Sequence, residues 1–171
     1  MREVQQLADW PYAKEPFYIA QVQNALLHTI SFLMSEQICV TWGFDDAALP
    51  DGERLIGFGV MHLSDLYAAV TEHKRHLYIP LLSIKPNIQS KGYGRTIVQY
   101  LVEEAERSVR AVAQQRGMAI SDHLFLDVYI ENNDAIKCYK KCGFRIINEQ
   151  SPLLDEEENN APYFVMVKKL V

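Results

Sequence analysis

The sequence predicts one α/β domain built on a mixed β-sheet, because two kinds of strand connection follow each other along the chain. Two β-rich runs, 38–44 and 55–63, are separated by the turn-forming segment ALPDGE, which predicts an antiparallel hairpin. After residue 77, strand-like and helix-like runs alternate, as in strand–helix–strand units. The chain has 171 residues, 49% of them apolar and 23% charged, which suits one domain spanning 1–171 and hardly two.

The first half of the chain supplies three further elements. Apolar spacing predicts a helix over 17–35. The segment SDLYAAV (64–70) predicts a short helix with Ser64 or Asp65 as its cap. The continuous apolar run 77–84 predicts a buried central strand, in which Pro80 must stand where no backbone N–H is needed.

The second half predicts alternating helices and strands. A long helix follows residue 94, because apolar residues recur every three to four positions up to Val112, and Gly117 ends it. The remaining elements are expected as a strand at 124–130, a helix at 133–142 ended by Gly143, and strands at 144–149 and 163–170.

Composition and charge exclude several classes of protein. A net charge of −5 argues against generic nucleic-acid binding, which needs clustered Lys and Arg. The chain has neither a long apolar N-terminal segment nor an apolar run of about twenty residues, so neither a signal peptide nor a membrane span is expected. Its three cysteines form no disulfide framework and no zinc pattern, which favours a cytoplasmic protein without a metal. Cys138 and Cys142, four residues apart, are interpreted as packing residues.

The stretch QSKGYG (89–94) combines features of a phosphate-binding turn. It precedes a predicted helix, whose first N–H groups lack partners and carry positive charge. Glycine lets the backbone approach a phosphate closely, and Lys91 and Arg95 add charge. A dinucleotide fingerprint would need a third small residue where Ile97 stands, and a P-loop pattern is absent, so a nucleotide-binding protein is disfavoured.

Two linked motifs give the chain a resemblance to the GCN5-related N-acetyltransferase (GNAT) family. The pattern [QR]-x-x-G-x-[GA] after a strand and a Pro-containing loop is matched by Gln89, Gly92 and Gly94. A second pattern, N-x-x-A-x-x-x-Y-x-x-x-G-F, is matched in register by Asn132, Ala135, Tyr139, Gly143 and Phe144. The resemblance covers residues 55–170. It implies a twisted central mixed sheet of about six to seven strands, flanked by helices and splayed at the strands that bind acetyl-CoA.

The resemblance also implies roles for individual residues, with acetyl-CoA as co-substrate. Backbone groups of Leu82, Ser83 and Ile84 would pair with the pantetheine arm. Asn132 would contact the pantetheine as well, and Tyr139 would protonate the departing thiolate. The pyrophosphate would be wrapped by Gln89, Ser90, Lys91, Gly92, Tyr93, Gly94 and Arg95.

The chemistry of acetyl transfer sets what else the site needs. An amine attacks only when neutral, and neutralising a lysine side chain at pH 7 costs roughly 4–5 kcal/mol, so a base, a water relay or desolvation is required. Asp127 is the first candidate base, and Glu131, His62 and His76 are alternatives. The attack creates a negatively charged oxygen that needs a fixed N–H donor, which a bulge near Leu82 could supply. No enzyme nucleophile is required.

The sequence therefore predicts an acetyl-CoA-dependent N-acetyltransferase whose acceptor is a primary amine of a small molecule, peptide or protein. The acidic run 155–158 suggests a cationic acceptor, although such runs are most often solvated loops. A homodimer is compatible with the family. The alternative is a non-catalytic CoA-binding or regulatory module of the same fold, since the family's usual strand glutamate has no equivalent in LYIPLLSI.

Overall fold

A computed structural model of the chain describes residues 39–50, 54–72, 75–109, 111, 120–148 and 163–171. The predicted helix at 17–35 and the acidic run at 155–158 lie outside these residues. The domain organisation over 1–171 stays a prediction.

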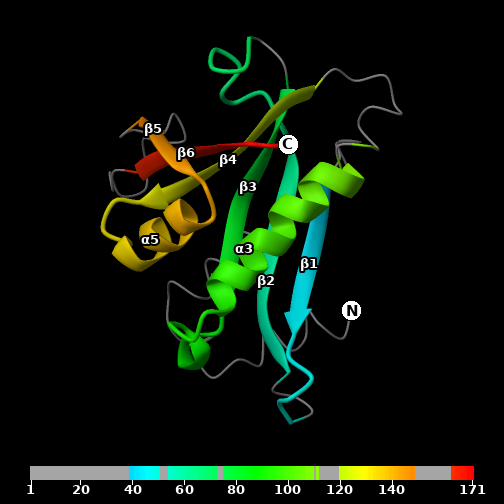
Figure 1. The fold of residues 1–171 in the computed structure, drawn as a ribbon, viewed down its shortest axis with the longest axis vertical. Coiled ribbons are helices and arrows are strands. Elements are labelled where there is room, and N and C mark those ends of the chain that lie inside the picture. Colours follow the sequence, from blue (N-terminus) through cyan, green and yellow to red (C-terminus); the bar gives the residue numbers. More distant parts are fainter. Residues whose placement is uncertain (1–38, 51–53, 73–74, 110, 112–119, 149–162) are drawn as a thin grey trace, which may run out of the picture.

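The described residues form a mixed sheet of six strands in the order β1-β2-β3-β4-β6-β5 (Figure 1). Only β3 and β4 run parallel, and every other neighbouring pair is antiparallel. The predicted hairpin, the central strand and the mixed sheet are thereby confirmed. The strands are β1 (Cys39–Asp45), β2 (Leu55–Ser64), β3 (Arg75–Ile84), β4 (Ile120–Tyr129), β5 (Arg145–Asn148) and β6 (Tyr163–Lys169).

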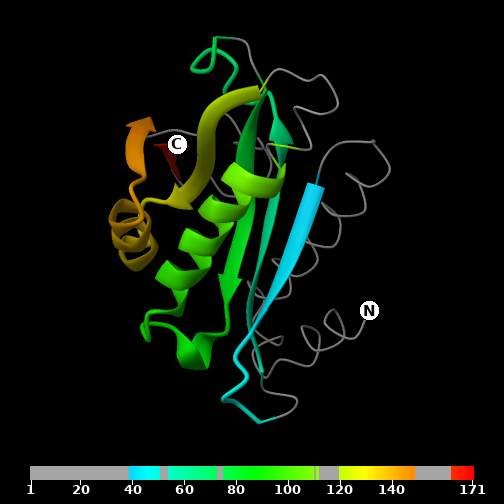
Figure 2. The ribbon, with the colours of Figure 1, turned by 45° about the vertical axis from the view of Figure 1, so that its right-hand side comes forward.

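Two helices cover the same face of the sheet, as Figures 1 and 2 show. They are α3 (Tyr93–Glu104) and α5 (Asn133–Lys141), and they contact each other. Their apolar sides bury Ile97, Leu101 and Ile136 against alternate residues of β3 and β4. The opposite face carries a second apolar cluster, which we call the aromatic face: Tyr67, Tyr78, Phe125, Val165 and Val167.

Strands β3 and β4 separate halfway along their length. Their last paired residues are Ile79 and Leu126. Beyond this point β3 stays paired with β2 as far as Ile84, and β4 stays paired with β6 as far as Tyr129. The two halves of the sheet therefore open like a V, which confirms the predicted splay.

Pro80 stands at a bulge where β3 begins to leave β4. Between the pairs Val60–Leu81 and His62–Tyr78, β3 has one residue more than β2. A bulge leaves its extra residue outside the ladder, so the missing N–H of proline costs nothing there. This explains how a proline fits into the middle of a largely apolar central strand.

Three expected elements differ in detail. Residues 66–72 form consecutive turns instead of a short helix, and Ser64 Oγ accepts a hydrogen bond from the N–H of Leu66, a local bond that competes with helix formation. Strand β4 begins at Ile120, four residues before the expected start. The long helix is α-helical only to Glu104 and continues as a π-helical turn, Ala105–Val109.

Leu101 tests the packing of α3 on the sheet. Its side chain is fully buried, so Leu101→Ala should lower the free energy of unfolding by about 2–5 kcal/mol. Urea denaturation measures this difference. The control, Gln99→Ala, changes an exposed residue of the same helix and should shift the free energy by less than about 0.5 kcal/mol. Equal effects of the two substitutions would contradict the packing.

Candidate active site

The open edge of β3 presents backbone groups to the space between β3 and β4. The N–H of Lys85 donates to the carbonyl of Ile56 at 2.9 Å, which fixes the alternation of hydrogen-bonded pairs along β2 and β3. Ser83 then bonds to β2 opposite Phe58, whereas the backbone groups of Leu82 and Ile84 point away from β2. Of the three residues expected to face the pantetheine arm, two are turned toward the opening.

The N-terminus of α3 closes one end of this opening. Gly92 is its cap residue, with φ of 92°, and it has no side chain that could occupy the first N–H groups. Ser90 also has a positive φ, of 64°. A Cβ built on Gly92 meets nothing within 4 Å, so the turn borders open space. Gln89 ties the turn to the strand, because its Nε2 donates to the carbonyl of Ile84 at 2.9 Å.

The first turn of α3 is held close to its neighbours. A Cβ on Gly94 would lie 3.1 Å from Cδ1 of Ile84 and 3.6 Å from Sγ of Cys138, so a glycine lets α3 approach both β3 and α5. The Tyr93 hydroxyl donates to the carboxylate of Asp46 at 2.5 Å. This bond lowers the pKa of Asp46 and raises the pKa of Tyr93. The side chain of Tyr93 thus anchors the helix start to the turn after β1.

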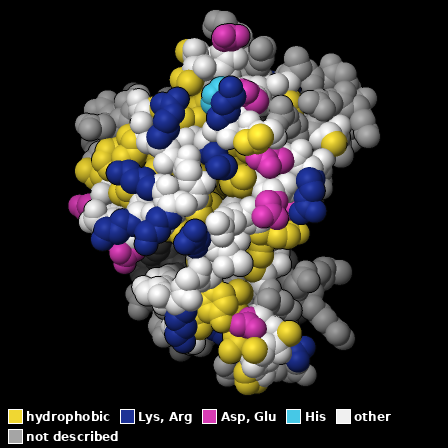
Figure 3. Space-filling view, in the orientation of Figure 1, with side chains coloured by type: hydrophobic (Ala, Val, Ile, Leu, Met, Phe, Trp, Pro, Cys, Tyr) yellow, Lys and Arg dark blue, Asp and Glu magenta, His cyan; other side chains and the backbone are white. Residues whose placement is uncertain are grey.

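Positive side chains gather on the face that carries α3 and α5 (Figure 3). This contrasts with the net charge of −5 for the whole chain. Positive charge beside the open N-terminus of a helix favours a bound phosphate. The exposed cations of the α3 start and of α5 are Lys91, Arg95, Lys137, Lys140 and Lys141.

Helix α5 contributes Asn132 and Tyr139 on the same side. Asn132 caps the helix, since its side-chain oxygen accepts from the N–H of Ala135 at 3.2 Å. Tyr139 is half-buried and its ring lies 6.1 Å from that of Phe144. Burial raises the pKa of Tyr139 above its usual value, and the thiol of Cys138 raises it further. The phenol carries its proton at neutral pH, as an ordinary tyrosine does, so a proton is available at this position.

Asp127 lies on the aromatic face, immediately after the last rung that joins β3 to β4. Two phenols donate to its carboxylate: Tyr67 to Oδ1 at 2.5 Å and Tyr78 to Oδ2 at 2.9 Å. Burial and the charge of Asp127 raise the pKa of Tyr78 well above its usual value. The carboxylate and the phenol of Tyr139 thus belong to opposite faces of the sheet.

The two tyrosines around Asp127 are absent from the sequence-based candidates. Tyr78 could have been found by strand alternation, because it pairs with Phe125, two residues before Asp127 on the same face. Tyr67 belongs to the turn after β2, sixty residues from Asp127, and nothing local in the sequence connects the two.

The other three candidate bases are two histidines and one glutamate. His62 is buried beside the ring of Tyr78, with Nδ1 2.9 Å from the carbonyl of Leu63. His76 is fully buried beside the rings of Tyr67 and Phe125. Glu131 is exposed in the turn before α5. Asp127 is the carboxylate that the structure places at the separation of the strands.

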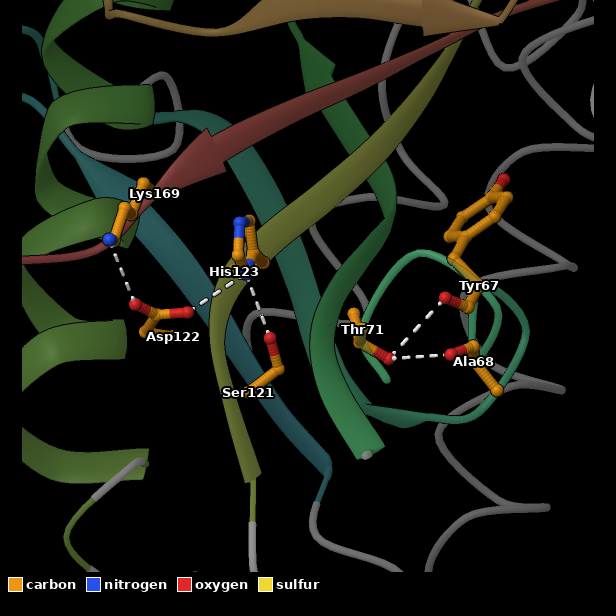
Figure 4. Close-up of polar contacts among 7 residues, drawn as sticks. All are labelled: Tyr67, Ala68, Thr71, Ser121, Asp122, His123 and Lys169. Carbon is orange, nitrogen blue, oxygen red and sulfur yellow. Dashed lines mark hydrogen bonds and ion pairs between the residues drawn. The ribbon is translucent and has the colours of Figure 1, made fainter. Parts of the chain in front are cut away.

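A Ser–Asp–His group at the start of β4 does not form a nucleophilic relay (Figure 4). Ser121 Oγ and Asp122 Oδ1 both lie 2.9 Å from the same nitrogen, Nδ1 of His123. A relay needs the serine and the carboxylate on different ring nitrogens. Asp122 also lies 3.6 Å from Nζ of Lys169, so the group holds β4 to β6.

Cys138 and Cys142 pack between α5 and α3. Sγ of Cys142 lies 3.8 Å from the carbonyl of Arg95. Burial raises the pKa of both thiols, that of Cys142 to about 11. Protonated, packed thiols agree with the interpretation of this pair as packing residues.

Neither a membrane-spanning helix nor a metal-binding cluster occurs among the residues that the structure describes. Among their helices, none is long and apolar enough to cross a bilayer. Within the same ranges, no three His, Cys, Asp or Glu side chains come together as metal ligands would.

Comparison with known proteins connects this geometry to one family. The model of the acetyltransferase (GNAT) family matches residues 4–144. A relative from Drosophila melanogaster, the "Probable N-acetyltransferase san", is 33% identical over 78 residues. The match covers 46% of this chain and 37% of that relative, so the chain spans little more than a third of the curated relative's length.

Solved structures share the fold at low sequence identity. A chimera of the spermidine N-acetyltransferase SpeG from Vibrio cholerae and hSSAT matches with a TM-score of 0.65 and 14% identity, over 99% of this chain and 90% of that one. NAA60 from Arabidopsis thaliana, in complex with a bisubstrate analogue, matches with a TM-score of 0.62 and 17% identity, over 83% and 81%. The same plant protein has also been solved with acetyl-CoA and matches with a TM-score of 0.59 and 18% identity, over 84% and 82%.

The raised thiol pKa predicts slow alkylation of Cys142. At pH 8 a thiol with a pKa of about 11 is roughly 0.1% ionised, whereas an ordinary cysteine is about one-quarter ionised, and the thiolate is the reactive form. Iodoacetamide should therefore modify Cys142 at least about a hundredfold more slowly than it modifies glutathione, the free-thiol control. Peptide mapping by mass spectrometry follows the reaction. Equal rates at pH 8 would contradict a buried, protonated thiol.

Proposed function

The chain belongs to the acetyltransferase (GNAT) family, and on this premise we propose that it transfers an acetyl group from acetyl-CoA to a primary amine by direct attack in a ternary complex. The observation that carries the proposal is the continuous path from the open edge of β3 to the uncapped N-terminus of α3. Such a path suits a ligand with an amide-containing arm and a pyrophosphate.

The donor site uses the backbone more than side chains. Leu82 offers its backbone groups to the pantetheine amides, as an added strand would be bound, beside Ile84, whose carbonyl accepts from Gln89. The turn from Gln89 to Arg95 holds the pyrophosphate, with Gly92 leaving room for close approach and Lys91 and Arg95 supplying charge. Asn132 already caps α5 with its oxygen, so its amide nitrogen is the group left for the pantetheine.

Acetyl-CoA supplies an activated thioester, and the residues of this chain move the protons. Asp127, at the separation of the strands, receives the proton that the attacking amine must lose. Tyr139, which carries its proton at neutral pH, gives that proton to the departing sulfur. Backbone N–H groups of β3 near the Pro80 bulge stabilise the negative charge that develops on the carbonyl oxygen.

A panel of amines tests the activity. Acetyl-CoA is offered with spermidine, with a peptide that begins with alanine, and with an N-terminally blocked peptide that has one lysine, and thiol release is measured. These acceptors represent a small molecule, a protein N-terminus and a protein side chain. Turnover of any one supports the proposal and names its acceptor class. Acetyl-CoA binding without turnover of any amine would contradict it and favour a non-catalytic CoA-binding module.

Gly92→Val tests the pyrophosphate site. The substitution adds a side chain where the backbone must approach a phosphate, at a position whose φ of 92° already favours glycine. Acetyl-CoA affinity, measured by calorimetry, should fall at least about tenfold. Gly43→Ala, on the exposed strand β1, is the control and should leave the affinity unchanged. Unchanged affinity of Gly92→Val would remove this assignment.

Tyr139→Phe tests the acid. The variant keeps the ring packed against Phe144 but cannot donate a proton, so kcat should fall by about 10²-fold or more while acetyl-CoA affinity changes little. Steady-state kinetics and calorimetry separate the two quantities. Tyr100→Phe, which removes a hydroxyl from an exposed residue of α3, is the control. A kcat that holds in Tyr139→Phe would make this tyrosine structural.

A further inference from the structure

Tyr67, in the turn after β2, donates a hydrogen bond to Oδ1 of Asp127. We infer that Tyr67 is a positioning residue for acetyl transfer. Its hydrogen bond to Oδ1 fixes the Asp127 carboxylate so that Oδ2 faces the Tyr78 hydroxyl. This inference rests on the proposed function. It adds the turn at residues 65–72, which neither motif includes, to the acceptor side of the active site.

Tyr67 is held in place before any substrate arrives. Its ring stacks on Phe125, with centroids 4.9 Å apart and planes 23° from parallel, and the residue is 6% exposed. The turn behind it is closed by Thr71, whose Oγ1 lies 3.4 Å from the carbonyl of Tyr67 and 3.3 Å from that of Ala68 (Figure 4). Because the ring and the turn behind it are both held, the Tyr67 phenol can orient the Asp127 carboxylate without losing conformational entropy during the reaction.

The two phenols donate to different oxygens of the Asp127 carboxylate. Tyr67 donates to Oδ1 and Tyr78 donates to Oδ2, so rotation of the carboxylate would break both bonds. A hydrogen bond from O–H to an ionised oxygen at 2.5 Å belongs to the short, charge-assisted kind. Asp127 is thereby kept as an acceptor whose Oδ2 faces the Tyr78 hydroxyl.

This arrangement provides a route for the amine proton. The Tyr78 hydroxyl donates its hydrogen to Asp127, so its oxygen can still accept a hydrogen bond from an amine N–H. As the amine attacks, its proton passes to the Tyr78 oxygen while the proton of Tyr78 passes to Oδ2 of Asp127. One proton is gained and one is lost at Tyr78, and Asp127 ends protonated. Tyr67 keeps its proton throughout and holds Oδ1.

A relay also agrees with the short side chain of Asp127 and with the environment of Tyr78. Burial and the Asp127 charge raise the pKa of Tyr78 well above its usual value, so a free phenolate would be a costly intermediate. Passing one proton on while another arrives avoids that species. Tyr67 matters to this step because any turn of the carboxylate would separate Oδ2 from Tyr78.

A double-mutant cycle in the full chain tests the inference. Tyr67→Phe keeps the stacked ring and removes the hydroxyl, so kcat should fall about tenfold while KM for acetyl-CoA and for the best acceptor of the panel stays within about threefold. Asp127→Asn should lower kcat further. In the Asp127→Asn background, Tyr67→Phe should cost less than about twofold, because a positioning residue has nothing left to position. Tyr100→Phe is the control and should leave the kcat of each background unchanged.

A structural role for Tyr67 predicts a different pattern. Tyr67→Phe would then lower kcat by the same factor in the wild-type and in the Asp127→Asn background. That outcome would overturn the inference, and the proposed function would stand. Should Tyr67→Phe fail to fold, Thr71→Val serves as the second variant, since it loosens the turn and keeps the phenol. Its loss of kcat should likewise vanish in the Asp127→Asn background, and a persistent loss would overturn the inference. If the wild-type protein acetylates no amine of the panel, the proposed function itself is overturned, and the inference rests on that function.

Discussion

The separation of β3 from β4 after Ile79 and Leu126 is the constraint on which the site depends. A strand that keeps one neighbour and loses the other must offer half of its backbone groups to something else. Here the alternation fixed by the Lys85–Ile56 bond selects Leu82 and Ile84 as the residues whose groups face the opening. The bulge at Pro80 places a residue without an N–H where β3 starts to diverge, so the separation is built into the strand.

The two faces of the opened sheet have different chemistry. One face has α3, α5, a group of exposed cations and the protonated phenol of Tyr139, which suits a phosphate-bearing donor and a leaving thiolate. The other has the aromatic cluster around Asp127, where two phenols hold one carboxylate. The proposed function therefore places the meeting of donor and acceptor at the point where the strands separate.

Most of the fold, and the positions of the segments proposed to bind the donor, could be predicted from the sequence. The hairpin, the central strand and helix α5 follow from local periodicity and turn residues, which act over a few positions. The Gly92–Gly94 turn and Asn132 could be singled out because each stands at the start of a helix, and their roles in binding the donor stay predictions. The segment 64–70 failed as a predicted helix because Ser64 bonds locally to the chain and the tertiary structure turns Tyr67 inward. Which amine is the acceptor stays a prediction for the panel to settle.

The sequence by itself determined which short segments bend, cap or extend, because glycine, proline, asparagine and apolar spacing act on neighbouring residues. Only the tertiary structure decided which side chains share an environment. Tyr67 and Asp127 are sixty positions apart, and they meet because the turn after β2 folds over the aromatic face toward β4. The tertiary structure also decided which of Leu82, Ser83 and Ile84 face the opening, since this depends on which of them bonds to β2. Contacts between distant segments follow from sheet register and packing, and no local pattern encodes them.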